Sequence, residues 1–223
     1  TFNRVASVQI LVGSPEIHVT AFVEESQQAL AELQRDVGSV AGVNRLEVNI
    51  AFEIRTYRSE FATLGMDMSG ADQIGDELDE MIIRQLHLDA RISFREIGRI
   101  LDVPASTVRE RVNRMLQTEV IRIGAVCDPH KIGLNVGAFA YLRVDPARID
   151  QALKHLENVP DMGEVGAVSG AHNVFVLMGA RDYEHVVDIV KHKVERTPGV
   201  QEISIRMISH TKKHRPDLIS IVP

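Results

Sequence analysis

The side chains best suited to chemistry in this 223-residue chain lie between residues 78 and 116. Residues 91–114 hold six arginines and three acidic residues, a net charge of +3, while the whole chain carries −6. A basic region in an acidic protein is the pattern expected where a surface contacts phosphates. The sequence shows no phosphate-binding loop, no Ser/His/Asp arrangement and no Cys/His cluster. We therefore predict a binding protein with no catalytic residue, metal or cofactor.

Two short helices joined by a tight turn are predicted to position these side chains. Ser93-Phe94-Arg95-Glu96 is a capping box, which predicts the start of the first helix. Asp102-Val103 forms the turn, and Pro104 stands where the first turn of the second helix tolerates proline. Apolar residues at helical spacing predict the buried sides, namely Ile97, Ile100 and Leu101 in the first helix and Val108, Val112 and Leu116 in the second.

The opposite side of the second helix is polar. Polar side chains flanked by arginines are typical of a helix that lies in the major groove of DNA. The alternative is that this face is only solvated. We predict that the DNA contacts are made by Arg91, Ser93, Ser106, Thr107, Arg109, Glu110, Arg111, Asn113 and Arg114.

The C-terminal part alternates between strand and helix patterns. Strands are predicted at residues 138–144, 165–169, 174–179 and 200–209, with helices that begin after Asp145 and Asp182. Val186, Val187, Val190 and Val194 are expected to face inward from the second of these helices. The order βαββαβ is that of a ferredoxin-like domain, in which two helices cover one face of a sheet with strand order 4-1-3-2.

The first 57 residues repeat the last two-thirds of that plan. A shift of 157 residues places Gly13 on Gly170 and Gly42-Val43 on Gly199-Val200 without a gap. The repeat lacks the first strand and helix, so its sheet would contain an open position with unpaired backbone groups. We interpret the chain as a fragment whose upstream residues, another helix-turn-helix among them, belong to the natural protein. The alternative is that a strand from a partner fills the gap.

The predicted fold class is α+β, with a winged-type helix-turn-helix and a ferredoxin-like effector domain preceded by a truncated ferredoxin-like repeat. Its parts are a partial ferredoxin-like domain at 1–57, a linker at 58–76, the helix-turn-helix at 77–119, a strand linker at 120–137, the effector domain at 138–213 and a tail at 214–223. No apolar run approaches the roughly 20 residues that span a bilayer, and Cys127 is the single cysteine. We expect a cytoplasmic protein without a membrane partner.

Together these motifs resemble the Lrp/AsnC (feast/famine) family of transcriptional regulators. The resemblance runs from residue 78 to about 213, and its DNA-binding signature is Asp89-Ala90-Arg91-Ile92-Ser93 followed by Ser106-Thr107-Val108 and Arg111-Val112. It implies a regulator that binds double-stranded DNA, forms a homo-oligomer and responds to a small-molecule effector, an amino acid or a related metabolite.

The resemblance also implies an effector site. In the family, the turn after the second strand of the ferredoxin-like domain borders the effector pocket. That turn is Gly170-Ala171-His172-Asn173 in this chain. The family usually has an aspartate at the last position, and Asn173 lacks the charge that would pair with an amino acid's ammonium group.

Two other functions are compatible with the same fold. Sirohaem decarboxylases resemble this family, but an enzyme of that kind would need basic and histidine side chains on the sheet face and a second helix without its polar side chains. A sensor that oligomerises without binding DNA is the other alternative. The polar side chains kept by the second helix favour the regulator.

Overall fold

A computed structural model describes residues 5–23, 26–57, 75–118, 120–121, 123 and 129–214. The chain divides into two compact units. One unit holds the helices between residues 77 and 117, and the other holds the N-terminal and C-terminal segments together. Most of the predicted linker at 58–76, the predicted tail beyond residue 214 and much of the first part of the predicted strand linker at 120–137 lie outside the described residues. Among the helices that are described, none combines the length and the apolar character needed to cross a membrane.

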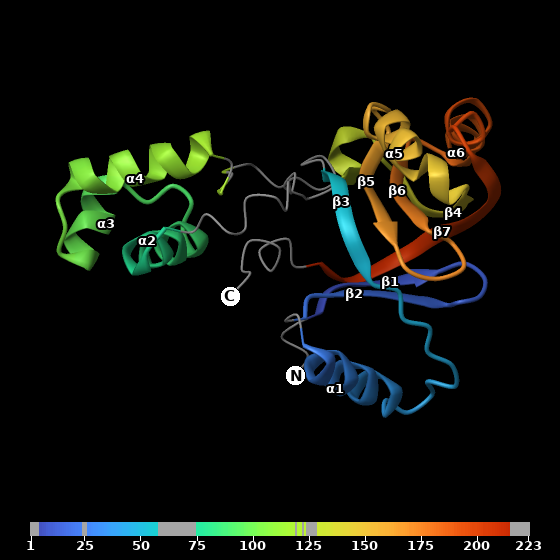
Figure 1. Cartoon of the computed structure of the whole chain (residues 1–223), viewed down its shortest axis with the longest axis horizontal. Helices are drawn as coiled ribbons and strands as arrows, with labels where there is room; N and C mark the ends of the chain where they lie inside the picture. Colours follow the sequence, from blue (N-terminus) through green and yellow to red (C-terminus); the bar gives the residue numbers. More distant parts are fainter. Residues whose placement is uncertain are drawn as a thin grey trace. The chain divides into compact units, whose positions relative to one another are not determined.

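The helix-turn-helix unit consists of α2 (Glu77–Leu88), α3 (Phe94–Leu101) and α4 (Ala105–Gln117) (Figure 1). Gly98 lets the start of α4 approach α3, because a Cβ at this position would lie 2.5 Å from the Val103 carbonyl oxygen. Asp102 takes a left-handed conformation, with φ of 55°, at the predicted turn. The buried core of the unit is formed by Ile82, Leu86, Ile97, Val108, Val112 and Met115.

Two predicted core positions in this unit are wrong. Ile100 and Leu116 are exposed, and Met115 is buried where Leu116 was expected. The helical period explains the exchange, since Val108, Val112 and Met115 follow the i, i+4, i+7 spacing of one helix face.

The predicted helix starts are confirmed in part. Ser93 Oγ accepts a hydrogen bond from the Glu96 N–H at 3.1 Å, as expected for the N-cap of α3. The Glu96 carboxylate accepts hydrogen bonds from Arg99 instead of reaching back to Ser93. Pro104 is the N-cap of α4, so this helix begins one residue later than predicted.

The C-terminal segment has the predicted ferredoxin-like fold. Its elements are β4 (Val136–Val144), α5 (Ile149–Glu157), β5 (Met162–Val168), β6 (Val174–Ala180), α6 (Tyr183–Ile189), which continues as a π-helical turn (Val190–Val194), and β7 (Val200–His214). The strand order β7-β4-β6-β5 is the predicted 4-1-3-2 order. Short 3-10 helices at Pro129–Ile132 and Pro146–Arg148 flank β4, and the carboxylate of Asp145 caps the second of them.

The ferredoxin-like core lies between the sheet and its two helices, which lie on the same side of the sheet (Figure 1). Alternate residues of β4, among them Ala138 and Ala140, face this core and pack with Leu153 of α5. Val186 and Val194 are buried there, as is typical of an amphipathic helix. Val187 is exposed, contrary to the prediction.

The N-terminal segment has the element order expected from the repeat, with β1 (Val5–Leu11), β2 (Ile17–Ala21), α1 (Gln27–Gly38) and β3 (Ala51–Tyr57). It does not form a sheet of its own, which corrects the prediction of a separate partial domain at 1–57. β1 pairs with β2 and β7, and β3 pairs with β5, so one sheet of order β2-β1-β7-β4-β6-β5-β3 results. β1 and β3 thus pair with β7 and β5, the edge strands of the C-terminal part, whereas β2 pairs only with β1.

The long strand β7 belongs to both parts of the sheet. Residues 200–208 pair with β4, and residues 208–214 pair with β1. The ring of His18 on β2 stacks on Phe139 of β4 with 4.2 Å between their centroids. Phe139 points away from the face that α5 and α6 cover, because it alternates with the core residues Ala138 and Ala140. The β1–β2 hairpin therefore folds over the sheet face that the helices leave open.

Candidate DNA interface and effector-binding turn

The outer face of α4 is exposed as predicted. Ser106, Arg109, Glu110 and Asn113 are exposed, whereas Thr107 is half-buried. Ser106, Glu110 and Asn113 follow i, i+4, i+7 spacing, so their side chains lie along one line of the helix surface. Arg91 and Ser93, just before α3, are also exposed. Together these residues form a polar surface, which we call the α4 face. The opposite side of α4 packs in the core of the unit.

Two of the predicted DNA contacts are engaged inside the unit. Nη1 of Arg111 lies 2.5 Å from Oδ1 of Asp76 and 3.0 Å from Oδ1 of Asp79. Nη2 of Arg114 pairs with the other carboxylate oxygen of Asp79. The Asp79 side chain has no exposed surface, so its charge must be balanced by these arginines. Arg111 and Arg114 therefore connect α4 to α2, and their contact with DNA stays a prediction.

Asp79 was not identified from the sequence, although a signal was present. Asp79, Ile82 and Leu86 share the buried side of α2. Asp79 precedes Ile82 by three residues and Leu86 by seven, so it lies on the same side of the helix as these core residues. A carboxylate on that side is expected to be buried, and a buried carboxylate needs a cationic or hydrogen-bonding partner. Hydrogen bonding to Arg111 also lowers the pKa of the neighbouring Asp76 carboxyl.

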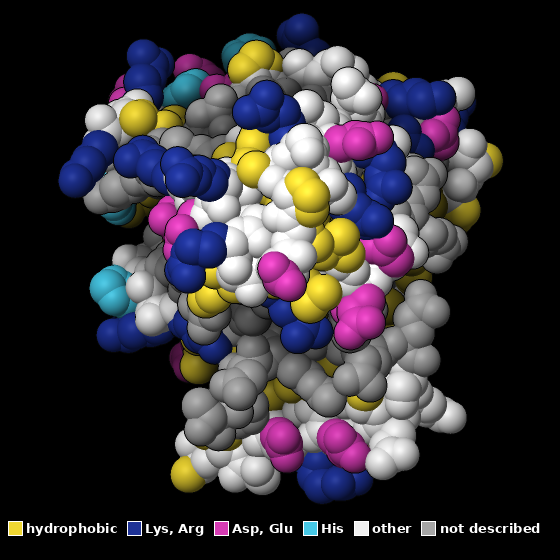
Figure 2. All heavy atoms as spheres, turned by 90° about the vertical axis from the view of Figure 1, so that its left-hand side faces the viewer, with side chains coloured by type: hydrophobic (Ala, Val, Ile, Leu, Met, Phe, Trp, Pro, Cys, Tyr) yellow, Lys and Arg dark blue, Asp and Glu magenta, His cyan; other side chains and the backbone are white. Residues whose placement is uncertain are grey.

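The remaining arginines of the unit differ in their pairing. Arg99 is paired with Glu96, and Arg84 lies 3.8 Å from Glu80. Arg91, Arg95 and Arg109 are exposed, and the described residues include no ion-pair partner for them. In Figure 2, basic side chains (dark blue) gather in groups with acidic ones (magenta) between them, so the face shown is mixed in charge. Arg95 was not among the predicted DNA contacts, but it is exposed like Arg91 and Arg109 and is a further candidate phosphate contact.

The predicted effector-binding turn lies between β5 and β6. Oδ1 of Asn173 accepts a hydrogen bond from the Val144 N–H at 2.8 Å, and its Nδ2 donates to the Val144 carbonyl at 2.7 Å. Asn173 thus connects the turn to the end of β4, and each end of its amide makes one hydrogen bond within the protein. Ala171 and Gly170 are exposed, and a Cβ on Gly170 would lie 2.2 Å from Asn49 Oδ1.

His172 has a ring nitrogen that could form a hydrogen bond with a ligand. Its Nε2 is buried, has no hydrogen-bond partner among the described residues and lies 3.9 Å from Oε1 of Glu202. Its ring lies 6.3 Å from that of Tyr141. A buried polar atom without a partner is costly, so a ligand that supplies a hydrogen bond there would be favoured.

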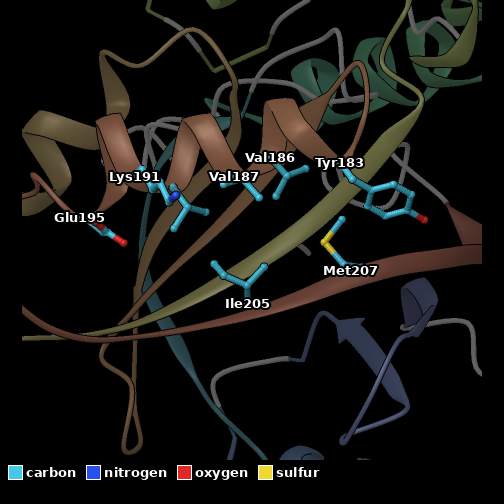
Figure 3. Close-up of a pocket in the computed structure, with 8 residues that line it drawn as sticks. Tyr183, Val186, Val187, Lys191, Glu195, Ile205 and Met207 are labelled. Carbon is cyan, nitrogen blue, oxygen red and sulfur yellow. The ribbon is translucent and has the colours of Figure 1, made fainter.

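A separate hollow of about 300 Å³ lies between α6 and β7 (Figure 3). Val186, Val187, Ile205 and Met207 supply apolar surface, with Lys191 and Glu195 toward one end and Tyr183 toward the other. The predicted effector residues do not line this hollow.

The sheet face opposite the helices is covered by side chains of the β1–β2 hairpin. Nδ1 of His18 lies 2.8 Å from the Tyr141 hydroxyl, and its Nε2 lies 3.2 Å from Thr20 Oγ1. Burial lowers the pKa of His18 to about 4, raises that of Tyr141 to about 12 and raises that of Glu164 to about 8. The two ring nitrogens of His18 are thus used within the protein, which does not favour the sirohaem alternative.

A three-helix unit whose last helix, α4, has an exposed polar side is linked in the same chain to a ferredoxin-like domain, and this combination defines a helix-turn-helix regulator with a ligand-binding domain. The family model described as the AsnC-type helix-turn-helix domain matches residues 76–116, and that of the Lrp/AsnC ligand binding domain matches residues 137–218. The chain belongs to the Lrp/AsnC family of transcriptional regulators.

A curated relative agrees with this assignment, and solved structures share the fold. An uncharacterised HTH-type transcriptional regulator of Pyrococcus abyssi is 34% identical over 139 residues, which cover 62% of this chain and 88% of that protein. The structure of Escherichia coli AsnC matches with a TM-score of 0.55 and 22% identity, covering 63% of this chain and 95% of that one. A transcriptional regulator of Neisseria meningitidis, solved as a complex with L-methionine, matches with a TM-score of 0.56 and 16% identity, covering 64% of this chain and 94% of that one.

Proposed function

We propose that this protein binds double-stranded DNA sequence-specifically through the α4 face and regulates transcription in response to a small-molecule effector. The observation that carries the proposal is the exposure of Ser106, Arg109, Glu110 and Asn113 on the side of α4 opposite its buried Val108, Val112 and Met115. A merely solvated helix would not require this combination of arginines and short polar side chains next to a tight turn.

The roles of these residues follow from their chemistry. Arg91, Arg95 and Arg109 contact phosphates and set the position of the unit on the duplex. Asn113 is suited to a bidentate contact with adenine, and Glu110 can accept a hydrogen bond from the amino group of cytosine. Arg111 and Arg114 act indirectly, because they hold α4 against α2.

The proposed effector is an amino acid or a related metabolite, which would bind at the turn of residues 170–173 in a cytoplasmic homo-oligomer. The Lrp/AsnC ligand-binding domain and the L-methionine complex of the Neisseria relative support this class of ligand. His172 would contact the effector, whereas Asn173 would position the turn. An effector that prefers one assembly would shift the oligomer, and with it the spacing of the α4 helices.

The test is selection of DNA from a random duplex pool by the purified protein, followed by titration of the selected site at several salt concentrations. We expect a site whose half-sites recur at about one helical turn or a multiple of it. The logarithm of the binding constant should fall linearly with the logarithm of the salt concentration. Sizing at fixed salt with and without each amino acid tests the effector. No affinity for any duplex in dilute buffer, or a Soret-type absorption in the purified protein, would overturn the proposal.

A further inference from the structure

The two parts of the sheet are related by an internal pseudo-twofold symmetry. Adding 157 to the number of Ser7 on β1 gives Glu164 on β5, and subtracting 157 from its partner His214 on β7 gives Tyr57 on β3. Glu164 and Tyr57 are also paired with each other. The other four pairs of the two ladders correspond in the same way, as do the positions of their irregularities. Each part of the chain therefore contributes its last strand to the edge of the other part.

The backbone contacts beside these ladders follow the same relation. The Val12 N–H donates to the Met207 carbonyl at 2.9 Å, and the Ser169 N–H donates to the Ile50 carbonyl at 2.8 Å. The shift converts one hydrogen bond into the other. This correspondence in three dimensions supports the internal duplication predicted from the sequence, and it makes residue-by-residue comparison of the two parts meaningful.

The comparison shows that apolar side chains of the N-terminal part are exposed where their counterparts in the C-terminal part are buried. Ile17 and Val19 of β2 are 55% and 38% exposed, whereas their counterparts Val174 and Val176 on β6 are fully buried. Residues 43–50 form no strand, whereas their counterparts at 200–207 pair with β4. Leu46, Val48 and Ile50 are also exposed, while their counterparts Ile203, Ile205 and Met207 pack against the C-terminal core.

The difference has one structural cause. In the C-terminal part, β6 and residues 200–207 are joined by β4, and α5 covers the sheet. The N-terminal part has no counterpart of β4 and α5 among its described elements. On the free side of β2, the backbone is unpaired within the described sheet, which makes this strand a template for another strand.

We propose that β2, α1 and residues 43–50 form an acceptor site for a strand–helix polypeptide unit of the β4–α5 kind. The strand of this unit pairs with the free edge of β2 and with residues 43–50. It presents apolar side chains at alternate positions, like Ala138, Ala140 and Leu142. The helix that follows packs an apolar stripe, like that of Leu153 and Leu156, over Ile17, Val19 and α1. The bound unit completes a second ferredoxin-like core, and this inference does not depend on the proposed DNA binding.

The probe for this site is a fluorescein-labelled peptide with the sequence of residues 136–157, the strand–helix unit that the chain itself contains. Binding to the full chain is followed by fluorescence anisotropy, and a peptide of the same composition in scrambled order is the control. We expect saturable 1:1 binding of the native peptide and at least about tenfold weaker binding of the scrambled one.

Two matched variants locate the binding. Val19→Lys puts a charge on the acceptor site and should weaken peptide binding at least about tenfold. Leu88→Lys adds the same charge at an apolar residue of α2 that is already 79% exposed, and it should leave binding within about twofold. The circular dichroism of both variants should match that of the parent protein, because each altered side chain is already exposed.

Other outcomes would decide against the acceptor site or against the proposed function. No saturable binding, or binding that Val19→Lys does not weaken, would show that the site does not accept this unit. An oligomer that dissociates in Val19→Lys without any peptide would assign the same surface to a second copy of the chain. Loss of DNA binding with intact peptide binding would overturn the proposed function and leave the acceptor site standing.

Discussion

Nη1 of Arg111 on α4 lies 3.0 Å from Oδ1 of Asp79 on α2, a carboxylate without exposed surface. Arg114 pairs with the second oxygen of the same carboxylate. These ion pairs help to set the orientation of α4 relative to α2. The position of the α4 face therefore depends in part on Asp79, a residue of another helix.

Arg111→Ala should destabilise the helix-turn-helix unit by about 3 kcal/mol, because it leaves part of a buried carboxylate charge uncompensated. Hydrogen exchange of the α2 and α4 amides measures this loss. Arg109→Ala, at an exposed arginine of the same helix, is the control and should leave the protection unchanged. Normal protection in Arg111→Ala together with weakened DNA binding would return Arg111 to the DNA interface.

Arg109→Ala and Asn113→Ala should affect DNA binding in different ways. Loss of the arginine removes a phosphate contact, so binding to all sequences should weaken and the salt slope should decrease by about 1. Loss of the asparagine should relax the preference at one base pair by about 1–3 kcal/mol. Binding titrations on the selected site and on single-base variants measure both effects, and equal effects on every sequence would contradict the groove assignment.

His18 should make the ferredoxin-like unit less stable in acid. Burial lowers its pKa from 6.5 to about 4, so the unfolded chain takes up a proton below pH 6.5 while the native state does not. The free energy of unfolding should fall by about 3 kcal/mol between pH 6.5 and 4 from this group. His18→Phe introduces the residue type of its counterpart Phe175 and should reduce this dependence in urea unfolding followed by circular dichroism. An unchanged pH profile would show that His18 takes up its proton at the same pH in the native and unfolded states.

Glu164 should have the opposite dependence. Burial raises its pKa from 4.5 to about 8, so the native state keeps a proton that the unfolded chain loses above pH 4.5. This group therefore costs stability increasingly as the pH rises from 4.5 to 8. Glu164→Gln should raise the melting temperature relative to the parent protein more at pH 8 than at pH 5. A difference that does not change with pH would mean that Glu164 is ionised in the folded protein.

Asn173→Ala should destabilise the ferredoxin-like unit by about 2 kcal/mol, since two hydrogen bonds to Val144 are lost. His172→Ala removes a side chain whose Nε2 has no described partner, and thermal unfolding should be nearly unchanged. If the proposed effector site is correct, His172→Ala should abolish the effect of the amino acid on oligomer size. A stable Asn173→Ala protein that no longer responds to the effector would show direct contact by Asn173.

Local patterns were sufficient for much of the fold. The cap at Ser93, the turn at Asp102 and the cap at Asp182 depend on hydrogen bonds within a few residues, and each is found where it was predicted. The βαββαβ order led to the observed order β7-β4-β6-β5, because the ferredoxin-like connections leave few alternatives. The exposed positions of α4 followed from the helical period alone.

The tertiary structure decided which charged side chains are free and which are used. Arg109 and Arg111 are two residues apart and chemically identical, yet only Arg111 lies against Asp79. Likewise, the amide of Asn173 and the imidazole of His172 differ in availability because β4 ends beside one of them. The pairing of β1 with β7 and of β3 with β5 joins residues about 110 to 200 positions apart, and no local pattern specifies it. The sequence by itself determined the elements, since their signals act over a few residues, whereas partners distant in the chain are determined by packing, which exists only in the folded protein.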